Sequence, residues 1–370
     1  MGQVSFAGGC KMRWYGRLWI CVFGVFVFCE CSALWAGPVW EDTALLPYPY
    51  GRSGVELEPV PGSREYGVVA TDESGNLGYC QGAGETWSSS VVTTEAVNSS
   101  RFGLGYDSFS GRPRISYFDS DSLNMAAFDG SMWSSETITS VTGSGSSLVV
   151  DPVNGVPMVA YSSSGVQFAW KSGSGWNTEV VATGFGSFNS VSLQIDPLTG
   201  QPCVAYSDTF DGAYFARRMA GGIWLTEQVE SLSFPHNTVL EFNPVTGRPG
   251  LAYQTSSGAP VRYAEFDGTS WNTTQVSASG HTCWDQVGLA YLEDGSPVVA
   301  YTAGAFSSEP VLEWGFYLAM EENGSFDVVS QHSYGDYNWN GPVDLEIEKE
   351  LINVAYYGTS VGTHIASMPE

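Results

Sequence analysis

Three histidines recur at one place in the internal pattern of the chain, in the segments that lead into three successive apolar strands. They are His236, His281 and His332, and aromatic, acidic and basic residues accompany them. Aromatic rings stack on the apolar face of a sugar, and Asp, Arg or His side chains satisfy its hydroxyl groups. The candidate ligand-binding residues are Arg52, His236, His281, Trp284, His332, Asp336, Tyr337 and Trp339.

Metal binding and catalysis have weaker support in the sequence. The three histidines lie at different offsets from the strands that follow them, which argues against a metal cluster. Asp119-Ser-Asp121 and Asp208 to Asp211 place oxygen ligands in loops, as calcium sites do, but no D-x-D-x-D-G pattern is present and Asp is an ordinary turn residue. We therefore expect no cofactor, with calcium as the less favoured alternative, and we name no catalytic residue.

The elements that position these residues are copies of one unit. Residues 192–206 (SLQIDPLTGQPCVAY) nearly repeat residues 147–161 (SLVVDPVNGVPMVAY). The tyrosine that ends the stretch recurs at steps of 44, 45, 47, 48 and 55 residues, as Tyr117, Tyr161, Tyr206, Tyr253, Tyr301 and Tyr356. A period in the forties with strand-like patterning is typical of a β-propeller blade.

Each copy predicts four strands, which we call A to D. Strand A is the run Leu193 to Ile195, a turn follows from Asp196 to Gly200, and strand B begins at Pro202. Strand C resembles Val261 to Phe266. Strand D begins with an aromatic residue, for which we predict packing between neighbouring blades: Trp87, Trp133, Trp176, Trp224, Trp271 and Phe326.

The seventh copy stops after three strands. The segment Trp40 to Leu46 resembles a strand D, so we predict that it completes the last blade and closes the ring. The helix-like string Glu346 to Leu351 is then a hairpin. The fold class is an all-β, seven-bladed β-propeller of four-stranded antiparallel blades, with the last blade closed by the N-terminal strand.

Residues 1–36 have the layout of a signal peptide. Arg13 and Arg17 precede the apolar run Leu18 to Cys29, small residues lie near Ala36, and the run is too short to span a membrane. The start is Met1 or Met12. We expect secretion or a periplasmic location in a bacterium, followed by a single propeller domain at residues 37–370.

The amino-acid composition argues against some classes of partner. The formal net charge is −25, and such a field repels nucleic acid and anionic lipid surfaces. We expect neither as a partner, and we expect a monomer. After the leader only Cys80, Cys203 and Cys283 remain, in three different copies of the unit, so we predict no disulfide.

The repeated S-L-x-h-D-P-x-T-G-x-P-h-h-A-Y unit (h, hydrophobic), followed by the segments Asp129 to Trp133 and Asp267 to Trp271, resembles secreted bacterial β-propeller repeat proteins of the sialidase-like layout. The resemblance covers the chain from Trp40 onward and implies the architecture. It implies no single activity, because such propellers include glycosidases, lectins and scaffolds. The arginine triad of sialidases has no match, so no catalytic residue is carried over.

Three functions remain open from the sequence. The favoured one is a non-enzymatic module that binds an extracellular glycan or protein through the face where loops join strand D to the next strand A, which we call the D–A loop face. The second is a glycan-active hydrolase or lyase that uses His and acidic residues on that face. The third is a scaffold without a ligand.

Overall fold

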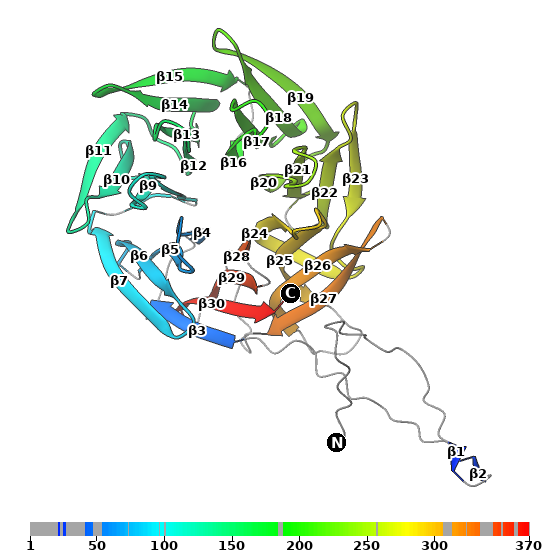
Figure 1. Cartoon of the computed structure of the whole chain (residues 1–370). Helices are drawn as coiled ribbons and strands as arrows, with labels where there is room; N and C mark the ends of the chain where they lie inside the picture. Colours follow the sequence, from blue (N-terminus) through cyan, green and yellow to red (C-terminus); the bar gives the residue numbers. More distant parts are fainter. Residues whose placement is uncertain are drawn as a thin grey trace. The chain divides into compact units, whose positions relative to one another are not determined.

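The computed structural model contains only strands, turns and loops in the residues that it describes. These are residues 21–22, 25–26, 41–46, 54–72, 74–95, 97–99, 101–183, 188–256, 258–305, 313–322, 324–333, 343–348, 351–358 and 362–369. Between Pro38 and Glu370 they form seven four-stranded antiparallel sheets around one axis (Figure 1). The predicted fold class is confirmed: this is a seven-bladed β-propeller.

Strand A of each blade lies nearest the axis. Blade one comprises β4 (Glu56–Pro59), β5 (Tyr66–Thr71), β6 (Leu77–Ala83) and β7 (Thr86–Thr93). Blade two comprises β8 (Gly103–Tyr106), β9 (Pro113–Phe118), β10 (Leu123–Phe128) and β11 (Trp133–Thr139). Blade three comprises β12 (Gly145–Val150), β13 (Pro157–Ser162), β14 (Val166–Ser172) and β15 (Gly175–Ala182). Blade four comprises β16 (Phe188–Ile195), β17 (Pro202–Asp208), β18 (Gly212–Met219) and β19 (Ile223–Ser231).

The remaining three blades continue the ring. Blade five comprises β20 (His236–Phe242), β21 (Pro249–Gln254), β22 (Val261–Phe266) and β23 (Trp271–Gln275). Blade six comprises β24 (His281–Tyr291), β25 (Pro297–Ala305), β26 (Glu313–Glu322) and β27 (Ser325–Ser333). Blade seven comprises β28 (Val343–Glu348), β29 (Leu351–Gly358), β30 (Gly362–Pro369) and the N-terminal strand β3 (Glu41–Leu46).

The turn between strands A and B follows from its sequence. Asp196 accepts hydrogen bonds at Oδ1 from the backbone N–H groups of Leu198 (2.8 Å) and Thr199 (3.2 Å). Gly200 closes the turn with a φ of +69°, which glycine adopts without steric cost. The Asp-Pro and Gly positions of the repeat therefore fix the hairpin that separates the axial strand from strand B.

The ring is closed as predicted. Strand β3 pairs antiparallel with β30, so that Glu41 lies opposite Ser367 (Figure 1). The carboxylate of Asp42 accepts a hydrogen bond from the hydroxyl of Tyr356 (2.8 Å) and lies 3.0 Å from Nδ1 of His364. Glu346 to Glu348 lie in β28, Leu351 opens β29, and Glu348 pairs with Leu351, which confirms the predicted hairpin. Trp40 lies outside the described residues.

The aromatic residues at the start of strand D pack between blades, as predicted. The ring of Trp133 in blade two meets Tyr79 in strand C of blade one edge-on, with centroids 5.4 Å apart. Trp87 and Trp176 pack against clusters that contain residues of the preceding blade. Ring contacts also join Trp224 to Phe168 and Phe326 to Tyr263 edge-on, and Trp271 to Phe215 at a tilt.

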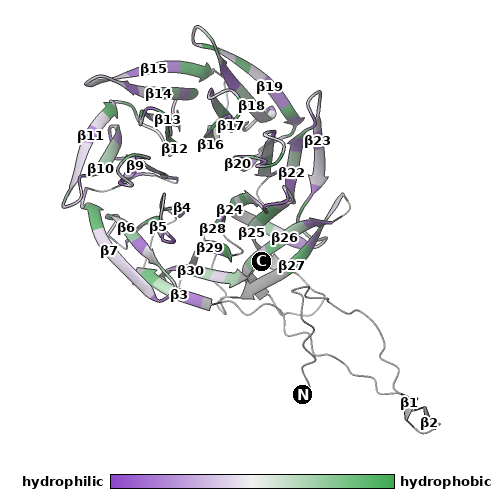
Figure 2. Ribbon diagram, in the orientation of Figure 1, coloured by the Kyte–Doolittle hydropathy of each residue, from purple (hydrophilic) through white to green (hydrophobic). Residues whose placement is uncertain are grey.

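The cores lie between adjacent blades. Hydrophobic and hydrophilic residues are intermixed along the strands (Figure 2), and the buried ones gather into seven clusters. Cys80, Cys203 and Cys283 are buried in three different blades as free thiols, so the prediction of no disulfide is confirmed for these residues. Burial raises the pKa of Cys80 and Cys203 to about 12 and that of Cys283 to about 11.

Residues 1–37 form a separate unit. In it the structure describes a two-stranded sheet of β1 (Cys21–Val22) and β2 (Val25–Phe26). None of the described residues belongs to a helix that could cross a membrane. The signal peptide stays a prediction.

Candidate functional site

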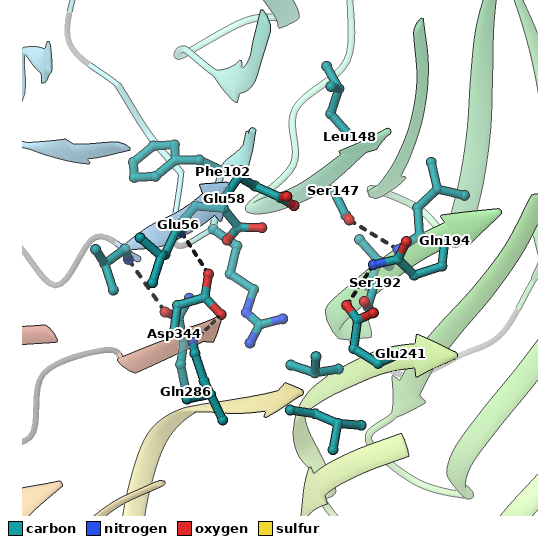
Figure 3. Close-up of a pocket in the computed structure, with 18 of the residues that line it drawn as sticks. Glu56, Glu58, Phe102, Ser147, Leu148, Ser192, Gln194, Glu241, Gln286 and Asp344 are labelled. Carbon is teal, nitrogen blue, oxygen red and sulfur yellow. Dashed lines mark hydrogen bonds between the residues drawn. The ribbon is translucent and has the colours of Figure 1, made fainter. Parts of the chain in front are cut away.

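A pocket opens at the axis of the ring, between the A strands of all seven blades (Figure 3). The cavity itself has a volume of about 50 Å³, within about 620 Å³ of open space that includes solvent. In order from blade one to blade seven, each blade contributes a lining residue: Glu56, Phe102, Ser147, Ser192, Glu241, Gln286 and Asp344.

Acidic side chains reach this pocket because they alternate with buried leucines. Glu56 and Glu58 flank Leu57 in β4, and the acid pair of β28 flanks Leu345 in the same way. Successive side chains of a strand point to opposite sides, so the leucines enter the blade and the acids face the axis. Figure 3 shows Glu56 and Asp344 on one side of the pocket, across from Glu241.

Some of the residues that line the pocket also connect neighbouring blades. In three blades the residue before the buried leucine accepts a hydrogen bond from the backbone N–H of the corresponding leucine in the next blade. The three bonds are Leu193 to Ser147 Oγ (3.0 Å), Leu240 to Ser192 Oγ (3.0 Å) and Leu57 to Asp344 Oδ2 (2.7 Å). These side chains tie the axial strands together, because A strands of adjacent blades share no ladder of hydrogen bonds.

The other carboxylates of the pocket accept fewer hydrogen bonds. Glu241 accepts a hydrogen bond from Nε2 of Gln194 (2.6 Å). Glu56, Glu58 and Glu346 accept no hydrogen bond from the residues that the structure describes.

The pocket raises the pKa of every acid in it. Burial and neighbouring carboxylates raise the pKa of Glu56, Glu58 and Glu346 well above the ordinary range. Burial raises the pKa of Glu241 to about 8. Burial raises the pKa of Asp344 only to about 6, because hydrogen bonds from the backbone N–H groups of Leu57 and Leu345 stabilise its carboxylate.

Arg101 is the one basic side chain among the described residues of the pocket. It precedes β8 of blade two, and its Nη1 donates to the backbone carbonyl oxygen of Thr238 in blade five (3.3 Å). Its buried Nε has no partner among the described residues. Burial lowers the pKa of Arg101, and Glu56 and Asp344 act against that change.

The arrangement therefore holds five carboxylates around one guanidinium. Part of the excess negative charge must be neutralised by bound protons or by a bound cation. Among the described residues no three His, Cys, Asp or Glu side chains are arranged to hold a metal ion.

The sequence predicted these eight residues in D–A loops, and the structure describes only some of them, within strands. Arg52, Asp336, Tyr337 and Trp339 lie outside the described residues. Trp284 lies within β24 and His332 within β27, but their side chains are not described. His236 and His281 open β20 and β24, the A strands of blades five and six. The predicted binding role of these eight residues stays a prediction.

His281 is held by two buried tyrosines. Its Nδ1 lies 3.1 Å from the hydroxyl of Tyr301, and its ring centroid lies 4.4 Å from that of Tyr317. Burial lowers the pKa of His281 and of His236, which favours the neutral imidazole. His281 is thus positioned as a neutral hydrogen-bonding group at the start of its strand.

An exposed aromatic pair lies on the same face, between blades four and five. Phe210 is 65% exposed and Phe234 is 51% exposed, and their rings meet edge-on at 5.9 Å. The backbone N–H of Phe234 donates to Thr209 O (2.7 Å), which ties the D–A loop to the B–C turn of blade four. Phe234 has a φ of +63°, a strained value for a bulky side chain.

The acid pairs that suggested calcium serve turns instead. Asp119 Oδ1 accepts hydrogen bonds from the backbone N–H groups of Asp121 (2.8 Å) and Ser122 (2.7 Å). Asp208 accepts one from the N–H of Phe210 (3.0 Å), and the hydroxyl of Tyr214 donates to Asp211. These contacts account for both pairs as turn residues.

The fold is similar to solved β-propellers, at low sequence identity. AofleA from Arthrobotrys oligospora is 14% identical, with a TM-score of 0.53 over 81% of this chain and 90% of that chain. The fungal lectin of Aleuria aurantia, a six-bladed propeller with a fucose recognition mode, is 14% identical, with a TM-score of 0.51 over 80% and 100%. YCF48 bound to D1 peptide is 12% identical, with a TM-score of 0.55 over 90% and 95%. No family model and no curated protein sequence matches the chain.

Sequence reasoning missed both the axial acids and the phenylalanine pair. The acids had a signal, because Glu56-Leu-Glu58 and Asp344-Leu-Glu346 alternate within a strand whose register places it at the axis. Phe234 lies in one of the aromatic-containing D–A loops that the sequence indicates, but its contact with Phe210 had no signal, since the two residues lie in different loops and the contact depends on a backbone conformation that the sequence does not favour.

Proposed function

We propose that this chain is a secreted binding module that recognises a carbohydrate through its D–A loop face. The observation that carries the proposal is the exposed pair Phe210 and Phe234. Two large apolar side chains that remain more than half exposed, on a backbone that bears strain, suit a ligand better than they suit the fold.

The surroundings of the pair favour a sugar. Aromatic rings cover the C–H face of a pyranose, and polar groups beside them bond its hydroxyls. Tyr214 stacks on Tyr206 with centroids 5.2 Å apart, and Gln228 Nε2 donates to the Tyr214 hydroxyl (3.1 Å). Asp208 and Asp211 make this part of the face acidic, which favours a neutral or cationic sugar over an anionic one.

The structural neighbours are consistent with a carbohydrate ligand but also include a peptide-binding propeller. Two of the similar propellers are lectins, one with a fucose recognition mode and one in complex with α-methyl fucoside. Another binds a peptide. A protein ligand is therefore the alternative that the experiment has to separate.

The test is binding of the purified protein and its variants to a panel of neutral, amino and acidic glycans. Phe210→Ala and Phe234→Ala are expected to weaken binding at least tenfold. Phe109→Ala is the matched control, because Phe109 is 73% exposed in an A–B turn, on the opposite side of its blade. Equal binding by all three variants would overturn the proposal. Release of shortened glycans would instead identify a hydrolase or lyase.

A further inference from the structure

The A–B turns of four successive blades each expose a large apolar side chain at the same position of the repeat. In blades two to five this residue stands two positions after the Asp or Asn that caps the turn, and its backbone N–H donates to that cap. The four residues are Phe109, Val153, Leu198 and Val245, which are 73%, 82%, 74% and 62% exposed. Because they share one repeat position in adjacent blades, they lie at one height along an arc of the ring, which we call the apolar arc.

Side chains of the apolar arc also lie against the turn of the next blade. A Cβ atom built on Gly155 of blade three would lie 3.2 Å from the ring of Phe109, and one built on Gly247 of blade five would lie 2.8 Å from the side chain of Leu198. Singly exposed apolar residues are normal on a protein surface, whereas a row of them indicates an interaction surface.

Charged groups beside the apolar arc form opposite pairs within the chain. The pairs are Arg114 with Asp107 (2.7 Å), Lys171 with Glu136, and Arg218 with Glu179 (2.7 Å). The turns of blades one and six at the same end of the ring are acidic instead, with Arg64 as the one basic residue described there. Their exposed acids are Glu65, Glu85, Glu293, Asp294 and Glu322. Two copies of a chain with a net charge of −25 repel each other over most of their surface, so the apolar arc is the part of this end through which they can approach.

We propose that a second copy of this chain covers the apolar arc, so that the protein is a two-fold symmetric dimer instead of the monomer expected from the sequence. A two-fold interface uses one surface patch of both copies, so the apolar side chains of each copy are buried against those of the other. A lipid surface fits less well, because the exposed acids of blades one and six lie at the same end of the ring.

The arrangement of the turns indicates where the two-fold axis runs. Strand A is nearest the ring axis and strand D farthest from it, so the A–B turns lie inside the C–D turns (Figure 1). A two-fold axis parallel to this end, between the two rows of turns in blades three and four, exchanges the inner row of one copy with the outer row of the other. Leu198 then faces Ile223 of the second copy, which is 67% exposed at the start of strand D of blade four. The acidic turns of the two copies lie on opposite sides of the dimer, which keeps like charges apart.

The dimer leaves the D–A loop faces of both copies open. The A–B turns and the D–A loops lie at opposite ends of the blades, so the two D–A loop faces point away from the interface. The inference is therefore independent of the proposed glycan site, and dissociation of the dimer leaves the affinity of one site for a soluble glycan unchanged.

Sedimentation of the purified protein over a range of concentrations tests the proposal. We expect a dimer whose dissociation constant falls as sodium chloride rises from roughly 0.05 to 0.5 M, because salt screens the repulsion between two acidic copies and leaves apolar contacts intact. Val153→Asp and Leu198→Asp are expected to raise the dissociation constant at least tenfold and to leave the melting temperature unchanged, since both side chains are exposed in a single chain. Val180→Asp is the matched control, because Val180 is 53% exposed near the other end of blade three.

Cross-linking tests the direction of the two-fold axis. Oxidation of the variant Leu198→Cys/Ile223→Cys should give a disulfide-linked dimer, whereas Leu198→Cys/Val180→Cys should give none. A protein that is monomeric at every concentration overturns the proposal, as does a dimer that persists in both aspartate variants. A monomer that binds lipid vesicles, and loses this binding in the aspartate variants, also overturns it and assigns the apolar arc to a membrane. A dimer that depends on the apolar arc but does not cross-link supports the interface and overturns the axis.

Discussion

The guanidinium of Arg101 reaches across the ring axis to the backbone carbonyl oxygen of Thr238, and so joins blade two to blade five. This bond connects strands 137 residues apart in the sequence, and it places a positive charge beside Glu56 and Asp344. The contact therefore combines a structural tie with partial neutralisation of the axial acids.

Arg101→Met should destabilise the protein by about 1–3 kcal/mol, the usual cost of losing a hydrogen bond from a charged donor. The loss should be greater at pH 8 than at pH 5, because more of the axial carboxylates are then ionised and miss their counter-charge. Urea unfolding at the two pH values measures it. Arg112→Met, an exposed arginine in the same blade, serves as control. A pH-independent loss would argue that Arg101 acts only through Thr238.

The free energy of unfolding should fall as the pH rises from about 4.5 to 8. Glu241 has a pKa of about 8 in the fold against an ordinary value of 4.5, so the folded protein keeps a proton that the unfolded chain releases. Its contribution is complete below pH 4.5 and is lost as the pH passes 8. Each pKa unit corresponds to about 1.4 kcal/mol, which makes the loss a few kcal/mol.

Urea midpoints at pH 4.5, 6 and 8 test this dependence. The double variant Glu58→Gln/Glu346→Gln should show a flatter profile, because two of the acids that raise one another's pKa are gone. Stability should also fall in strong acid, since turn hydrogen bonds hold the pKa of Asp267 and of Asp129 below the ordinary value. A profile that rises from pH 4.5 to 8 would contradict the assignment of the axial acids.

Much of the fold was predictable from the sequence because the blade repeats its local chemistry. The Asp196-to-Gly200 turn, the tryptophan at the start of strand D and the strand-D-like segment that ends at Leu46 each have a single structural consequence, and copies of the unit confirm one another. The last copy has only three strands in the sequence, so we could predict that β3 supplies the fourth strand and closes the ring.

The site was less predictable because it depends on convergence in space. Glu58, Glu241 and Glu346 lie in three separate copies, and only the ring brings them to one pocket. Each acid taken alone looks like a polar residue of a half-exposed strand. The histidine-rich loops attracted attention because they depart from the repeat, but a departure from a repeat marks a candidate and does not show what it contacts.

The strain at Phe234 predicts that glycine and alanine at this position differ in stability but not in binding. Phe234→Gly removes the Cβ that opposes a φ of +63°, and should be more stable than Phe234→Ala by about 1–2 kcal/mol. Both variants lose the ring and should bind a glycan equally poorly. Urea unfolding and the glycan panel together measure this. If alanine and glycine give the same stability, the strain is absent.

Removal of β3 should open the ring. A chain that begins at Gly51 lacks the strand that pairs with β30, so the C strand of blade seven becomes an exposed edge and the apolar contacts of Leu45 with blades one and seven are lost. We expect a fall in melting temperature of more than about 5 °C and a tendency to aggregate. A chain that begins at Pro38 keeps β3 and is the matched control, with no expected change. Thermal unfolding followed by circular dichroism decides between them. If the two chains melt together, the pairing of β3 with β30 contributes nothing to closure, and the N-terminal strand is an appendage of a ring that is stable without it.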